Sequence, residues 1–306
     1  MNMYQIPSPF TIRTVRNFLN EFEAIFKQEG RKIPNVLLVA NNPEFDLLGA
    51  LVFYKTIEFI IKKNCLYKPR LKGYKDCIYE MHKFGFGGLI SPYFEPNSAV
   101  LFTPKYQEYD GVFIAPFVLK DAICNQEEHQ YAPNIVKFYN NSTITYAIFQ
   151  CLAEIRSNFA EHAMDDTDTV LVASGNKESF KIVCADTGVG VISSLRPSLN
   201  ADRPLLPEDI LMLATHEGIT SKKNTNHMGY GLWLVNEFVE SQKGELHIYS
   251  EGAFYTNSSG KIKKGKCGFW QGTIIYVSLP LQNLKGFKSI MDAMATKYDD
   301  IKINQV

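Results

Sequence analysis

Apolar residues follow a helical period in the first part of the chain and then gather into a short run typical of a strand. In residues 11–30 they recur every three or four positions, which predicts a helix ending near Gly30. The positions of its buried stripe are Val15, Phe18, Leu19, Phe22, Ile25 and Phe26. The branched run 35–41 has the length of a buried strand, and a second helix is expected from about residue 46 to residue 63.

Two further strands are predicted before the middle of the chain, at 98–102 and 111–119. The segment 83–97 is rich in glycine, proline and aromatic residues, so we interpret it as a long ordered loop. The polar, proline-containing segment 121–134 is the best candidate for a domain boundary. The sequence therefore predicts a smaller α/β domain over residues 1–134.

The second half predicts a domain over residues 135–285 and a C-terminal tail at 286–306. Helices are expected from 141 to about Ala163 and at 229–242. Strands are predicted at four apolar runs: 168–174, 179–186, 245–249 and 272–281. The first two are separated by a short turn and should pair as a hairpin. A loop before the last strand carries Lys261, Lys263, Lys264 and Lys266. A solvated hairpin tip explains such a run, with a phosphate or nucleic-acid contact as the alternative.

Composition narrows the functional classes. The 306 residues suffice for about two domains, and 45% hydrophobic residues suit a filled globular core. Charges balance at 32 basic and 32 acidic residues, so we expect neither nucleic acid nor an anionic membrane as a partner. No apolar run approaches the about 20 residues that a membrane-spanning helix needs, and the N-terminus lacks the pattern of a signal peptide.

Six cysteines are scattered without a C-x-x-C pair, which argues against both a disulfide framework and a zinc site. Cys151 and Cys184 lie inside apolar periodic segments and are expected to be small core residues. A reducing cytoplasm is the simplest compartment for such a chain.

The stretch ADTGVGV (185–191) places an aspartate two positions before a pair of glycines, at the end of a predicted strand. It is not a dinucleotide-binding fingerprint, because Ser193 stands where the third glycine belongs and the acid precedes the glycines. The carboxylate of Asp186 accepts hydrogen bonds only, which suits an amino group such as that of adenine. Gly188 and Gly190 would let the backbone approach a flat base. A glycine-rich turn with a capping aspartate is the alternative.

Glu154, Asn158 and His162 are spaced by four and so share one face of the long helix. The amide oxygen of Asn158 can supply one ligand to Mg²⁺, and Glu154 can deprotonate an attacking water or hydroxyl. A solvated polar face is the alternative, and His162 taken alone suits a structural hydrogen bond. The core-facing stripe beside this face is formed by Cys151, Ile155 and Phe159.

Two later glycine motifs complete the candidate chemistry. Gly229 and Gly231 open a helix whose first amides and dipole favour phosphate oxygens, although packing alone also explains glycines there. Gly272 and Thr273 begin the last strand, where the threonine hydroxyl could reach a ring nitrogen of a base. A threonine in a strand is also ordinary.

Together these motifs resemble the histidine-kinase, gyrase and heat-shock-chaperone ATPase superfamily, the GHKL or Bergerat fold, over residues 141–282. The motifs occur in family order: E-x-x-x-N (Glu154, Asn158), D-x-G-x-G (Asp186, Gly188, Gly190), G-x-G-L (Gly229, Gly231, Leu232) and G-T (Gly272, Thr273). The segment 216–232 is similar to the lid of this family, which closes over the phosphates.

The resemblance implies a two-layer α/β sandwich with a mixed, largely antiparallel sheet, and ATP with Mg²⁺ as ligands. It assigns Asp186 to the adenine amino group, Asn158 to Mg²⁺ and Glu154 to the general base. It assigns the phosphates to the glycine-rich helix start at 229–232, helped by Lys222 or Lys223 of the lid.

The first half faintly resembles a STAS domain at residues 35–60, with a strand, a short loop and a helix. The phosphorylatable serine of anti-sigma antagonists is replaced here by Leu47 and Leu48, so a phospho-switch is not expected at this point. An unrelated α/β domain is the alternative.

Three functions follow from the resemblance. We prefer a Mg²⁺-dependent ATPase that acts as a nucleotide-controlled switch and signals through its N-terminal domain or a protein partner. The alternatives are an anti-sigma-type serine/threonine protein kinase and an ATP sensor without turnover, against which Glu154 argues. No acceptor residue or dimerising helix is visible in the sequence, and the oligomeric state stays open between a monomer and a homodimer.

Overall fold

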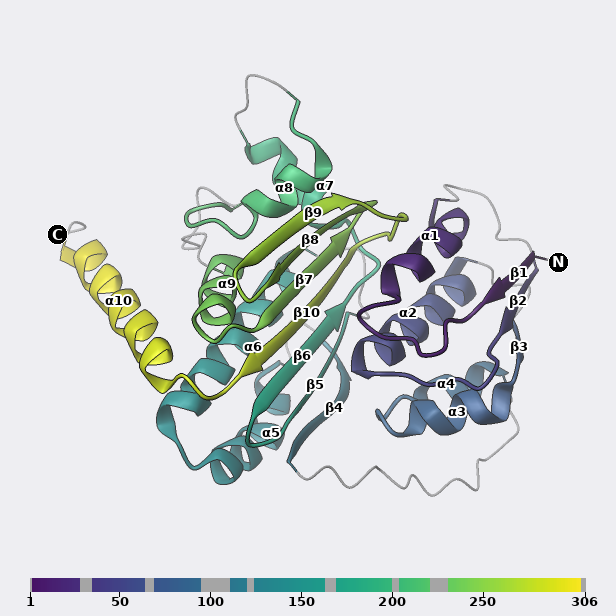
Figure 1. Cartoon of the computed structure of the whole chain (residues 1–306), viewed down its shortest axis with the longest axis horizontal. Helices are drawn as coiled ribbons and strands as arrows, with labels where there is room; N and C mark the ends of the chain where they lie inside the picture. The colour runs from purple at the N-terminus through teal and green to yellow at the C-terminus, as the bar shows by residue number, and fades with distance from the viewer. Residues whose placement is uncertain are drawn as a thin grey trace.

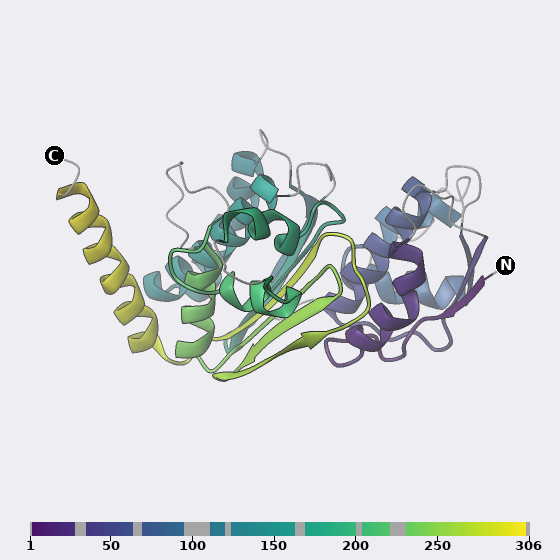
Figure 2. The ribbon, with the colours of Figure 1, turned by 90° about the horizontal axis from the view of Figure 1, so that it is seen from above.

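The computed structural model describes residues 2–27, 35–63, 69–94, 111–119, 124–162, 169–199, 204–220 and 231–303. Within these ranges the chain is an α+β protein with a three-stranded parallel sheet and a seven-stranded antiparallel sheet (Figure 1). The predicted α+β class is therefore confirmed. The smaller sheet and its helices form a unit beside one face of the larger sheet (Figure 2).

The smaller unit alternates strands and helices along residues 2–94. Its elements are β1 (Asn2–Gln5), α1 (Val15–Phe26), β2 (Val36–Val39), α2 (Leu47–Lys63), β3 (Arg70–Lys72), α3 (Tyr74–His82) and α4 (Gly87–Phe94). The first helix, the strand and the second helix confirm the prediction, and α1 buries all six residues of its predicted stripe. Gly30 and the strand predicted at 98–102 lie outside the described residues.

The loop predicted at 83–97 is wrong at its centre, where residues 87–94 form helix α4. Glycines and a proline suggested a break there, but Phe86 and Ile90 are fully buried (0% exposed) and anchor the segment in the core. Gly87 lies against the ring of His82, with a Cβ position 2.3 Å from the imidazole. Burial in the tertiary structure thus overrides the local helix-breaking residues.

The larger sheet has the strand order β4-β5-β6-β10-β7-β8-β9, and each neighbouring pair is antiparallel. Its strands are β4 (Val112–Val118), β5 (Val170–Gly175), β6 (Ser179–Ala185), β7 (Glu245–Ser250), β8 (Ala253–Ser258), β9 (Lys261–Lys266) and β10 (Thr273–Pro280). The predicted hairpin of β5 and β6 is confirmed. The sheet is wholly antiparallel over the described strands, where the resemblance implied a mixed one.

The lysine-rich loop expected before the last strand is instead the edge strand β9. It pairs with β8 over its full length, from Lys261 opposite Ser258 to Lys266 opposite Ala253. The lysines are tolerated because an edge strand leaves both of its faces near water, and lysine at an edge opposes pairing with other chains. Lys264 also forms an ion pair with Asp209, with 2.5 Å between Nζ and Oδ1.

Two helices of the larger unit lie where the sequence predicted a domain boundary and a C-terminal tail. The helices of this unit are α5 (Cys124–Tyr139), α6 (Ser142–His162), α7 (Val191–Leu195), α8 (Pro207–Leu213), α9 (Gly231–Ser241) and α10 (Leu284–Ile303), with a 3₁₀ turn at Arg196–Ser198. Residues 124–134 of the predicted boundary segment belong to α5, and β4 before it already belongs to the larger sheet. The tail at 286–306 is mostly helix α10, which is anchored by the fully buried Phe287.

Strands of the larger sheet alternate their side chains between two cores. In β6, Val183 and Ala185 face the smaller unit, whereas Ile182 and Cys184 face the core that contains α6 and α9. β5, β7, β8 and β10 alternate in the same way. The sheet is therefore a middle layer between two sets of helices (Figure 2). The resemblance implied two layers, and the smaller unit adds a third.

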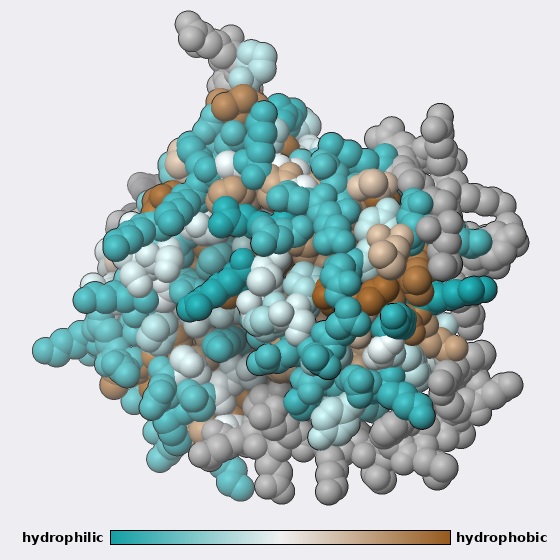
Figure 3. Space-filling model, turned by 45° about the vertical axis from the view of Figure 1, so that its right-hand side comes forward, coloured by the Kyte–Doolittle hydropathy of each residue, from teal (hydrophilic) through white to brown (hydrophobic). Residues whose placement is uncertain are grey.

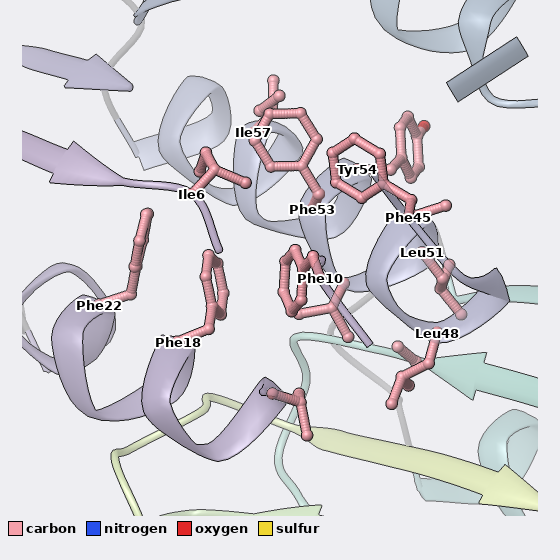
Figure 4. Packing of buried hydrophobic residues seen from close by; sticks show 14 of the residues in the cluster. Ile6, Phe10, Phe18, Phe22, Phe45, Leu48, Leu51, Phe53, Tyr54 and Ile57 are labelled. Carbon is pink, nitrogen blue, oxygen red and sulfur yellow. The ribbon is translucent and has the colours of Figure 1, made fainter. Parts of the chain in front are cut away.

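Helix α2 is the centre of the smaller unit, because every residue from Leu47 to Ile60 is buried. Aromatic rings of α1 pack beside it, with the centroids of Phe18 and Phe22 4.0 Å apart (Figure 4). The buried Lys55 places Nζ 2.5 Å from Oε2 of Glu58, which gives the charge a partner inside the core.

Figure 3 shows the molecule with the right-hand side of Figure 1 turned forward. Hydrophilic residues cover most of the described surface in this view. Among the described residues, no helix combines the length and the apolar content needed to cross a membrane.

The contact between the units predicts a clear effect of Gly268→Ala. The added Cβ would lie 2.0 Å from the carbonyl oxygen of Leu19 in α1, so the helix or the segment must shift. We expect the free energy of unfolding, measured by urea denaturation, to fall by about 1–3 kcal/mol. Gly88→Ala is the control, because its Cβ has no neighbour within 4 Å. Equal stability of the two variants would contradict this packing.

Candidate functional site

Asp186 follows the last residue of β6 and is almost fully buried, with 3% of its surface exposed. Its backbone amide donates to the carbonyl of Thr273 at 3.0 Å, which continues the β6–β10 ladder by one residue. Its carboxylate accepts from the amide of Gly188 at 2.6 Å through Oδ1 and from the amide of Thr273 at 3.1 Å through Oδ2. The structure thus brings together two motifs that the sequence singled out separately, D-x-G-x-G (Asp186, Gly188) and G-T (Thr273).

The two amide donors explain how a carboxylate is accommodated in the core, since a buried charge needs hydrogen-bond partners. Each oxygen of an ionised carboxylate can accept two hydrogen bonds.

Gly272 makes this arrangement sterically possible. Its φ of +91° lies in a region that side chains rarely adopt, and its Cβ position would be only 2.4 Å from Oδ1 of Asp186. The carboxylate, the backbone oxygen of Asp186 at 2.6 Å and the amide nitrogen of Gly188 at 2.8 Å together occupy the space that a side chain at position 272 would need. The glycine of the predicted G-T motif is thus required by the aspartate of the predicted D-x-G-x-G motif.

The hydroxyl oxygen of Thr273 is buried and accepts from the same amide as Ser250, a residue that the sequence analysis missed. The amide of Val191 lies 3.1 Å from the hydroxyl oxygen of Thr273 and 3.2 Å from that of Ser250. Ser250 donates its own proton to the carbonyl of Gly272 at 2.7 Å. Because Ser250 donates to Gly272, the hydroxyl of Thr273 can donate to Oγ of Ser250 at 3.4 Å, or to a ring nitrogen in its place.

Glu251, in the turn between β7 and β8, is a second missed residue. Its Oε2 accepts from the amide of Ser193 at 2.8 Å, and its Oε1 accepts from the hydroxyl of the same serine. The carboxylate also lies against Gly190, whose Cβ position is 2.6 Å from Oε2. Glu251 therefore holds the first turn of α7 next to the glycine loop. No local pattern in the sequence indicates this contact between residues far apart in the chain.

Asn158 and Gly231 bring the helices α6 and α9 together. The Nδ2 of Asn158 lies 2.8 Å from the Cβ position of Gly231, and it donates to the carbonyl of Glu154 at 2.8 Å. This orientation leaves the amide oxygen as the atom that can accept from, or coordinate, a ligand. Glu154 and Asn158 are both half-buried. The stripe predicted beside them is confirmed, because Cys151, Ile155 and Phe159 are buried.

Other predicted site residues are placed differently or not described. Leu232 is buried in the core beneath α9, where it contributes packing. Lys222, Lys223 and Gly229 lie outside the described residues, as does the side chain of His162.

Metal binding at Asn158 would depend on the ligand. Among the described residues, no group of three or more His, Cys, Asp or Glu side chains could hold a metal ion. A Mg²⁺ ion here would take one amide oxygen from the protein and its remaining ligands from phosphate and water, a donor set that suits this ion.

The predicted core cysteines are confirmed as buried residues. Cys151 and Cys184 are 0% exposed, and burial raises the pKa of both thiols. The neighbouring charge of Asp186 raises the pKa of Cys184 further. Both thiols therefore stay protonated at neutral pH, which excludes them as nucleophiles.

No protein-family model matches the chain, and no curated protein matches it in sequence. The residues of the site and their geometry therefore carry the functional inference.

The fit between Gly272 and Asp186 can be measured with Gly272→Ala. Gly260→Ala is a matched control, because its φ of +81° is similar but its Cβ has no neighbour within 4 Å. We expect the control to lose about 1–2 kcal/mol through backbone strain alone. Gly272→Ala should lose a further 1–3 kcal/mol, roughly, because the carboxylate must move. Equal losses in urea denaturation would show that the carboxylate does not limit position 272.

Proposed function

We propose that this chain binds ATP with Mg²⁺ and hydrolyses it as a nucleotide-controlled switch. The observation that carries the proposal is the buried carboxylate of Asp186, fixed by two amides at the end of a central strand. Thr273, the first residue of the neighbouring strand β10, places its hydroxyl group beside this carboxylate's strand end. An acceptor beside a donor is complementary to the amino group and the adjacent ring nitrogen of adenine.

A purely structural role for Asp186 is the competing explanation, and the chain itself contains an example. Asp46 accepts from the amides of Gly49 at 2.8 Å and Ile12 at 3.1 Å, a geometry that closely matches Asp186, and it caps helix α2. What favours a ligand at Asp186 is its surroundings. Glycines stand at positions 188 and 190 in the loop that follows it, and a threonine hydroxyl lies across the ladder.

Residues of α6 and α9 suit the phosphates and the metal ion. Gly231 is the first residue of α9, an 11-residue helix whose opening amides favour anionic oxygens. Asn158 lies against that helix start with its amide oxygen available to Mg²⁺. Glu154 is one helical turn before Asn158 and is the candidate base for an attacking water.

The smaller unit is the candidate receiver of the signal. Helix α2 packs against β5 and β6, and β6 leads directly into Asp186. A change in the loop after β6 is therefore next to the contact between the two units. The output of the switch would be a change in the smaller unit or in a protein partner that binds it.

The adenine assignment is tested with Asp186→Asn and with Asp46→Asn as its matched control. Both variants place an amide where two backbone donors expect a carboxylate, so both should lose comparable stability. Only Asp186→Asn should lose a charge-assisted hydrogen bond to the base, which we expect to weaken binding of a non-hydrolysable ATP analogue with Mg²⁺ by about 10- to 150-fold. Calorimetric titration of the folded variants measures this directly. Equal affinity in Asp186→Asn and wild type would refute the assignment.

Turnover is tested with Glu154→Gln and γ-labelled ATP. Removing a general base should slow phosphate release by about 10²- to 10⁴-fold while the affinity for ATP is kept. Glu23→Gln is the control, because Glu23 forms an exposed ion pair with Lys27 on α1. Free phosphate from wild type alone supports an ATPase. Label on the protein itself would favour the kinase alternative, and ATP binding without release would favour a sensor.

A further inference from the structure

The segment 267–272 between β9 and β10 touches both the smaller unit and the candidate nucleotide site. At its start, Cys267 and Phe269 pack against the core of the smaller unit. At its end, Gly272 lies against the carboxylate of Asp186. A single short connection therefore spans from helix α1 to the proposed adenine-binding residue.

Trp270 is the side chain in this segment that enters the smaller unit. It is fully buried (0% exposed), and its ring centroid lies 4.7 Å from that of Phe26 at the end of α1. Phe26 in turn lies 4.9 Å from Phe59 on α2. The indole is therefore part of the aromatic packing that joins the two long helices of the smaller unit.

The polar atoms of Trp270 form hydrogen bonds with residues of the larger unit. Its indole Nε1 donates to the carbonyl of Asp186 at 2.8 Å, and its own carbonyl accepts from the amide of Glu251 at 3.0 Å. Glu251 is the residue that holds the glycine loop through Ser193. Trp270 thus contacts Asp186 and the support of the neighbouring loop with its polar atoms, while its ring remains among apolar residues.

Helix α1 cannot move independently of this segment. The backbone of Leu19 and Asn20 lies against Gly268, where the Cβ position is 2.0 Å from the carbonyl oxygen of Leu19 and 2.4 Å from the amide nitrogen of Asn20. A displacement of α1 must therefore carry residues 268–270 with it or open this contact.

We propose that Trp270 is a positioning residue that couples helix α1 to Asp186, so that nucleotide binding and the arrangement of the smaller unit bias each other. This inference rests on the proposed function. A shift of Asp186 on nucleotide binding reaches Trp270 through the hydrogen bond from the indole N–H to the carbonyl of Asp186, and it reaches Phe26 through the contact between the two rings. The coupling is reciprocal, because a free energy that links two sites acts equally in both directions.

The decisive experiment is hydrogen–deuterium exchange of α1 with and without a non-hydrolysable ATP analogue and Mg²⁺. In wild type we expect the ligand to slow exchange of the α1 amides. In Trp270→Phe the ring contact is kept and the indole donor is lost, so the ligand should bind about 2- to 10-fold more weakly and leave α1 exchange unchanged at saturation. Tyr79→Phe, which changes an exposed aromatic residue on α3, should behave as wild type.

A second measurement covers the case in which Trp270→Phe does not fold. In the Trp233→Phe chain, Trp270 is the sole tryptophan, so its emission reports on this contact. We expect a saturable change in emission on adding the analogue, with a midpoint equal to the calorimetric Kd.

The outcomes separate the inference from the function on which it rests. Ligand binding without a change in either Trp270 emission or α1 exchange overturns the coupling alone. Equal ligand-induced protection of α1 in Trp270→Phe and wild type also overturns it. Absence of any calorimetric binding to wild type overturns the proposed function, and the coupling with it.

Discussion

One buried carboxylate sets the geometry of the larger unit at the end of its central strands. Asp186 accepts from the loop that follows β6 and from the first residue of β10, so separating the two strands there would remove a hydrogen bond from a buried carboxylate. Gly272 must lack a side chain because the carboxylate and the backbone of Asp186 and Gly188 fill that space. The shape of the candidate site is therefore a consequence of how the sheet accommodates this charge.

The larger sheet is covered on both faces, and this places the smaller unit next to the candidate site. Side chains of β6 alternate between the core shared with α1 and α2 and the core shared with α6 and α9. The candidate phosphate and metal residues lie on the α6 and α9 side, at Asn158 and Gly231. Trp270 reaches the α1 side. A switch built on this sheet has its ligand and its proposed receiver on the two sides of one layer.

Local patterns predicted the parts of the fold whose stabilising contacts are themselves local. The helical period of α1 and the hairpin of β5 and β6 were visible in the sequence, and both are confirmed. Helix α4 and strand β9 were missed, because glycine, proline and lysine indicate loops until the burial of Phe86 and the pairing with β8 are known. Ser250 and Glu251 were missed in the site because their partners, Val191 and Ser193, are 59 and 58 residues away in the sequence. Only the register of the strands brings them together.

The most direct measurement compares ATP with inosine triphosphate by calorimetric titration of the wild-type chain with Mg²⁺. The two nucleotides differ only at position 6 of the base and at the adjacent ring nitrogen, where donor and acceptor are exchanged. Because Asp186 accepts and Thr273 can donate, we expect ATP to bind and inosine triphosphate to bind at least about tenfold more weakly. Equal affinity for both, or binding of neither, would contradict a site that recognises adenine through Asp186.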